Sequence, residues 1–85
     1  MAISIIKKQH SVNMKSNEII ELRDCSAVQN CSNTHILYSF EPFGNENIGA
    51  PLIPLQLLYM PIGITTVYLK SSNKLVHIEA FGVSL

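Results

Sequence analysis

The last third of the chain, Thr65 to Leu85, shows the clearest alternation of apolar and polar side chains. Two runs rich in β-branched and aromatic residues are separated by a short polar break, which is typical of a β-hairpin. Lys70, His77 and Glu79 are predicted on one face of the two strands. The opposite face is predicted to be apolar and consists of Val67, Leu69, Val76, Ile78 and Ala80. Because an isolated hairpin is marginal in water, other parts of the chain or other copies must cover that face.

Further segments upstream have strand character. Ala2 to Ile6 fits a short first strand or an arm that docks on a neighbour, and the polar run Lys7 to Asn13 is expected to end it. His35 to Glu41 alternates, and so does Ile53 to Met60, which is flanked by prolines. Pro54 has no backbone donor, so we expect the start of the latter strand at a sheet edge, or only its second half paired.

The segment Asn17 to Asp24 alternates imperfectly, and a strand is the favoured interpretation. The alternative is a short helix near residues 17–30, capped at Ser16 and with acidic residues in its first turn. Residues 26–34 are small and polar and are predicted to form a loop.

Five or six short strands, separated by turn-forming residues, predict an all-β fold. We expect a small sandwich or barrel of antiparallel strands. The 85 residues are sufficient for a single domain, in which residues 1–10 are a candidate extended arm.

Composition favours association with other protein surfaces. Hydrophobic residues make up 47% of the chain and charged residues 14%, against about 25% in an average domain. Six basic residues balance six acidic ones, so the formal net charge is zero. Hiding apolar surface in a homo-oligomer or on a larger assembly would add stability to so small a domain.

The same numbers argue against two other classes of partner. Nucleic acid requires clustered basic residues, and the only adjacent pair is Lys7 with Lys8. No apolar run approaches the roughly 18 residues of a membrane span. The charges of the N-terminus follow a very short apolar stretch, the reverse of a secretory signal, so we expect a protein of the cytosol or of a particle assembled there.

A turn-rich loop from Pro42 to Pro51 carries two apolar side chains where solvent exposure is expected. Exposed apolar residues on a loop are candidates for protein contacts. Apolar residues of the arm, of this loop, and of the segments that follow it together form the predicted interaction surface: Ile3, Ile5, Phe43, Ile48, Met60, Tyr68 and Phe81.

Catalytic and metal-binding signals are weak, and we predict no catalytic residue, metal or cofactor. His77 and Glu79 stand two apart and would need a third ligand to hold zinc. The favoured interpretation is a surface pair that Lys70 stabilises across the hairpin. Cys25 and Cys31 are expected to be reduced thiols without a nucleophilic role.

The stretch Pro61-Ile-Gly-Ile-Thr-Thr-Val-Tyr-Leu-Lys-Ser-Ser-Asn-Lys-Leu-Val-His-Ile-Glu-Ala80 resembles the closing hairpin of small β-sandwich virion proteins of tailed phages, such as head-decoration or tail modules. The resemblance implies a structural subunit that binds itself and a capsid or tail, without catalysis. Its expected location is the virion, after assembly in the host cytoplasm. The alternative is a small soluble cytoplasmic protein or inhibitor that caps a protein partner through the loop at residues 42–51.

Overall fold

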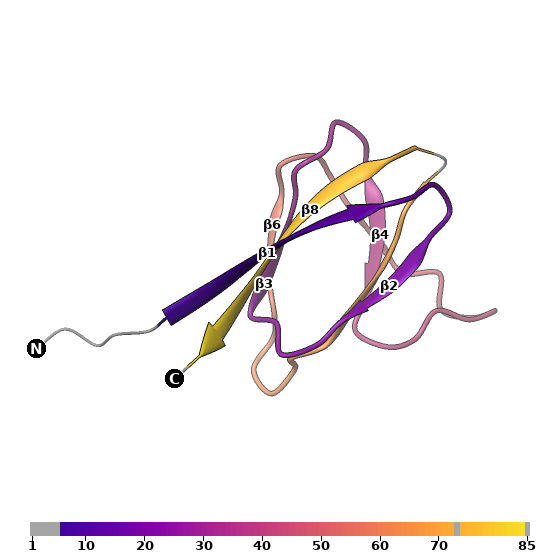
Figure 1. Cartoon of the computed structure of the whole chain (residues 1–85). Helices are drawn as coiled ribbons and strands as arrows, with labels where there is room; N and C mark the ends of the chain where they lie inside the picture. Colours follow the sequence, from indigo (N-terminus) through magenta and orange to yellow (C-terminus); the bar gives the residue numbers. More distant parts are fainter. Residues whose placement is uncertain (1–5, 73, 85) are drawn as a thin grey trace, which may run out of the picture.

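The computed structural model describes residues 6–72 and 74–84, with side chains for 11–72 and 74–82. This part of the chain is all-β, and every strand pairing is antiparallel (Figure 1). No helix long and apolar enough to cross a membrane occurs among these residues. The strands are β1 (Ile6–Met14), β2 (Ile19–Leu22), β3 (Ala27–Asn30), β4 (Ile36–Ser39), β5 (Ala50–Leu52), β6 (Leu57–Tyr59), β7 (Val67–Lys70) and β8 (Val76–Ser84).

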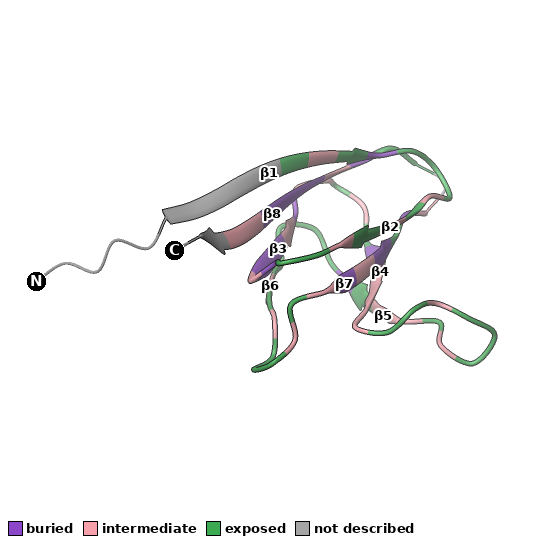
Figure 2. Cartoon of the chain, turned by 60° about the horizontal axis from the view of Figure 1, so that its bottom comes forward, coloured by how far each residue is buried: buried purple, intermediate pink, exposed green. Residues whose placement is uncertain are grey.

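The strands form two four-stranded sheets, with the orders β1-β8-β3-β6 and β2-β7-β4-β5. The inner faces of the two sheets share one hydrophobic core, as in a small sandwich, and Figure 2 shows the buried segments of both. Side chains of the predicted apolar face belong to this core, so that prediction is confirmed. The core residues are Met14, Cys25, Val28, Ile36, Leu52, Val67, Leu69, Val76, Ile78 and Ala80.

The predicted C-terminal hairpin is wrong. Strand β7 lies between β2 and β4 in one sheet, while β8 lies between β1 and β3 in the other. Strands β7 and β8 both bury their apolar faces in the core, one from each sheet. Each of them pairs with two strands from other parts of the chain. After Lys70 the chain therefore passes to the other sheet, where β8 begins at Val76, instead of turning back within the same sheet.

The described residues form eight strands instead of five or six, because three segments expected to be loops or turns are paired. The polar run from Lys7 lies within β1, where Val12 and Met14 alternate with exposed Ser11 and Asn13. Strand β3 lies in the predicted loop at residues 26–34, and β5 lies at the end of the turn-rich loop. Their polar or proline-containing sequences hide the alternation on which the sequence argument depends.

The alternative helix near residues 17–30 is also wrong, because β2 and β3 occupy that range. Asn17 and Asp24 have positive φ angles of 56° and 53°, and these two residues flank β2.

Within Ile53 to Met60 only β6, in the second half, is a strand, as anticipated from Pro54. Proline is tolerated in β5 because this strand is an edge of its sheet.

Strands β1 and β8 form the longest pairing, which runs from Met14 with Val76 to Ile6 with Ser84. Strand β3 pairs with β8 only as far as Phe81. The last part of the β1–β8 ribbon therefore extends beyond the rest of its sheet, as Figure 1 shows. Residues 1–5 of the candidate arm lie outside the described residues, whereas residues 6–10 belong to β1.

Candidate functional site

An open groove of about 460 Å³ lies on the outer face of the second sheet, beside the loop between β4 and β5. Its apolar lining comes from β2, β4 and the loop, and Lys70 of β7 borders it. Ile48 is 73% exposed and Ile19 51% exposed. The apolar residues of this groove, which we call the loop groove, are Ile19, Leu37, Phe43 and Ile48. Such a gathering of exposed apolar side chains is typical of a contact surface.

The loop has a defined shape because Asn47 ties it together. Its Nδ2 atom donates to Ser39 Oγ at 2.7 Å and also lies 3.0–3.1 Å from the carbonyl oxygens of Glu41 and Pro42. Its backbone carbonyl accepts from Gly44 N at 3.1 Å. These bonds hold the two ends of the loop together, so Phe43 and Ile48 are presented on the same side.

Gly49 closes the loop against Phe43, and we predict that its replacement by alanine destabilises the protein by about 1–3 kcal/mol. Its φ angle is 79°, and a Cβ atom would lie 2.6 Å from Phe43 Cε1 and 2.7 Å from the carbonyl oxygen of Tyr38. Urea denaturation measures the change. Gly44→Ala is the matched control, because nothing lies within 4 Å of a Cβ atom there. Equal stability of the two variants would contradict this packing.

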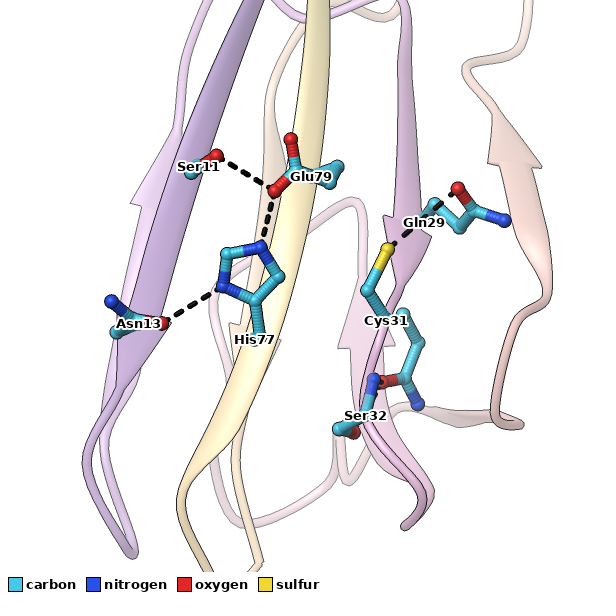
Figure 3. A network of polar contacts seen from close by, with 8 residues as sticks. Ser11, Asn13, Gln29, Cys31, Ser32, His77 and Glu79 are labelled. Carbon is cyan, nitrogen blue, oxygen red and sulfur yellow. Dashed lines mark hydrogen bonds and ion pairs between the residues drawn. The ribbon is translucent and has the colours of Figure 1, made fainter.

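A polar network occupies the outer face of the first sheet (Figure 3). His77 Nε2 contacts Glu79 Oε2, and His77 Nδ1 lies 2.8 Å from Asn13 Oδ1. Ser11 Oγ donates to Glu79 Oε2 at 2.7 Å. The Glu79 side chain is only 11% exposed although it lies on an outer face. The network therefore joins β1 to β8 and holds the imidazole in one orientation.

The predicted partner of the His77 and Glu79 pair is wrong. Lys70 is on β7 in the other sheet. The observed partners, Ser11 and Asn13, are on β1, in the polar run that was expected to end the first strand. Ser11 donates to the carboxylate and not to the imidazole, so these three residues do not have the order of a hydrolytic triad. Among the described side chains no group of three or more His, Cys, Asp or Glu is placed to hold a metal ion.

A second apolar groove, of about 210 Å³, lies on the same outer face toward β6. Phe81 of β8 and Tyr59 of β6 flank the small side chain of Ala27 between them. Tyr59 is 71% exposed. Phe81 was predicted as a contact residue, whereas Leu57 and Tyr59 were not. Apolar residues alternate from Ile53 to Met60, which places Leu57 and Tyr59 on the same strand face. This pattern is the sequence signal that could have identified them.

The remaining predicted contact residues do not share one surface. Met60 is partly buried because it packs against the core, and it lines an open pocket of about 350 Å³ with Cys25 and Ile64. Tyr68 lies on the outer face of β7, where its hydroxyl is 3.4 Å from Glu21 Oε2. Ile3 and Ile5 lie outside the described residues.

The two cysteines differ in exposure, and we predict that iodoacetamide modifies Cys31 long before Cys25. Cys25 is buried, its Sγ atom contacts the carbonyl oxygen of Ala27 at 3.1 Å, and burial raises the pKa of its thiol. A raised pKa leaves less thiolate, the reactive form, at a given pH. Cys31 is only partly buried. Mass spectrometry of the folded protein measures both rates, with guanidinium-unfolded protein as the control; equal rates in the folded protein would refute the assignment.

Apolar grooves on both outer faces thus coexist with a polar network on one of them. The loop groove brings together residues from three segments that are distant in sequence. Comparison of the chain with protein-family models, curated proteins and solved structures found no match.

Proposed function

We propose that the chain is a non-enzymatic structural subunit of a larger protein assembly, of the virion type, which associates with copies of itself and with the assembly through apolar surface. The loop groove is the observation that carries this proposal. Phe43 and Ile48 are held outside the core by a loop with its own hydrogen bonds, Ile19 and Leu37 lie beside them on strands, and Ile48 is largely exposed. Burying such a surface against another protein is its most favourable use in water.

The charge balance supports the same proposal. With a formal net charge of zero, the chain has little long-range repulsion to keep copies apart. Lys70, at the border of the loop groove, adds a cation that can pair with an acidic residue at the rim of an interface. The sequence resemblance to virion proteins points to a particle as the setting, and an assembly of repeated subunits would supply many identical contacts.

The second candidate is a protein that caps a partner through residues 42–51, and the exposure of Ile48 favours it equally. The two functions differ in what the isolated chain does. A structural subunit associates with itself, whereas a capping protein without its partner is expected to remain monomeric. Partner capture alone does not separate them, since both use the loop.

Ile48→Asp is expected to weaken self-association by about 30-fold or more, because a charge would enter the centre of an apolar contact. Sedimentation velocity over a range of concentrations measures this. Ile62→Asp is the matched control: Ile62 is fully exposed in the turn between β6 and β7 and is not part of the loop groove. Equal weakening by both variants, or none by Ile48→Asp, would refute the role of the groove.

A further inference from the structure

The four sheet edges of the sandwich are unequal. Strand β5 is an edge of three residues and includes Pro51, β6 has three residues, and β2 has four. Strand β1, the remaining edge, has nine residues and pairs only with β8 in the part of the chain that the structure describes. Proteins usually keep exposed edges short or interrupt them with proline, because unpaired N–H and C=O groups are a template for another strand. Three edges follow this rule and β1 does not.

We infer that β1 pairs antiparallel with β1 of a second copy about a two-fold axis, so that two sheets of four strands become one continuous sheet of eight. Among the four edge strands of this fold, only β1 of a second copy is as long as β1 itself. Pairing with a neighbour's β2, β5 or β6 would use no more than four residues of that partner strand. A two-fold contact also uses the same surface on both copies and therefore closes.

One register pairs all nine residues. In that register Ile6 faces Met14 of the other copy, Lys7 faces its Asn13, and His10 at the centre faces its own counterpart. The two positions of each pair differ by an even number of residues. Residues on one face of β1 are therefore paired with residues on the same face of the partner strand.

The charge pattern selects antiparallel over parallel pairing. A parallel, in-register pair would place Lys7 against Lys7 and Lys8 against Lys8, and like charges directly opposite one another are destabilising. In the antiparallel register the two lysines of one strand face Asn13 and Val12 of the other, which are uncharged. No acidic residue occurs in β1 that would favour a different offset.

Cysteine crosslinking tests the register. Removing the partly exposed thiol by Cys31→Ser leaves only buried Cys25, and single cysteines are then introduced at His10 or at Lys7. The two Cα atoms of residue 10 would lie about 5 Å apart, within the range for a disulfide. Those of residue 7 would be separated by six residues along the strands, about 20 Å. We expect mild oxidation to give a covalent dimer with His10→Cys and none with Lys7→Cys.

Each other outcome overturns the inference. Crosslinking of both variants would show parallel or unspecific pairing, and crosslinking of neither folded variant would show that this edge is not the interface. If His10→Cys fails to fold, as judged by circular dichroism, a mixture of Lys8→Cys and Val12→Cys chains replaces it, since these positions face each other in the same register. This inference extends the proposed self-association, but its test is separate: the crosslink is expected to persist when Ile48→Asp has removed the contact at the loop groove.

Discussion

Replacing Ile78 with aspartate is expected to abolish folding. Ile78 is the third residue of β8 and is fully buried in the core. Removing an aliphatic side chain from a core costs about 2–5 kcal/mol by itself, and a carboxylate without a partner in the same place adds several more. A typical domain has only about 5–15 kcal/mol of stability, and one of this size has a small core. Circular dichroism should show an unfolded chain.

Tyr68→Asp is the matched comparison, because Tyr68 lies in the neighbouring layer but on the outer face of β7. The variant is expected to fold, since it removes no core residue, and to associate more weakly. Some loss of stability is expected from the new charge opposite Glu21, which pairs with position 68 across the strands. If both variants unfold, or both fold, the division between an inner core face and an outer contact face is contradicted.

Asn30→Asp is expected to have the second largest effect. Asn30 is a polar residue with no exposed surface. Its Nδ2 atom donates to the carbonyl oxygens of Thr34 at 2.8 Å and Leu52 at 2.9 Å, and its Oδ1 atom accepts from the backbone N–H and the hydroxyl of Ser32. This one amide therefore links β3 to β5 of the other sheet and shapes the turn that follows β3.

Aspartate has the same shape but cannot donate while ionised. It would take the amide donor away from the carbonyl oxygens of Thr34 and Leu52 and set a negative charge against them, although the Ser32 hydroxyl, 3.0 Å from the Thr34 oxygen, would remain as a donor there. An unsatisfied buried group costs about 1–3 kcal/mol and a buried charge more, which predicts a total loss of about 2–6 kcal/mol. Urea denaturation measures it. Asn33→Asp, at an exposed position in the same turn, is expected to change stability by less than about 0.5 kcal/mol. A loss of similar size in both variants would mean that the buried amide has no special role.

Sequence alternation predicted which side chains of β7 and β8 face the core, but it did not predict the partners of these strands. The inner or outer orientation of a residue follows from the period of two along its own strand. Pairing depends on contacts between distant segments, and the nearest strand in sequence is not always the neighbour in space. The prediction of a hairpin failed for this reason, and with it the proposed contact between Lys70 and the His77 and Glu79 pair.

Polar strands were the other source of error. Only Val12 and Met14 mark the inner face in the second half of β1, and Asn30 occupies an inner position in β3, where an apolar residue is expected. Since Asn30 is compatible with the core only through its hydrogen bonds, its sequence context suggests a loop. The loop groove was easier to anticipate: Phe43 and Ile48 are apolar residues among turn-forming ones, although their neighbours Ile19 and Leu37 required the fold.

Light scattering of the purified wild-type chain tests the central claim, that the folded protein uses its exposed apolar surface and its open edge to associate with itself. We expect a discrete oligomer of two or more chains, whose mass rises with concentration and then reaches a plateau. A folded chain that remains monomeric at high concentration would contradict it.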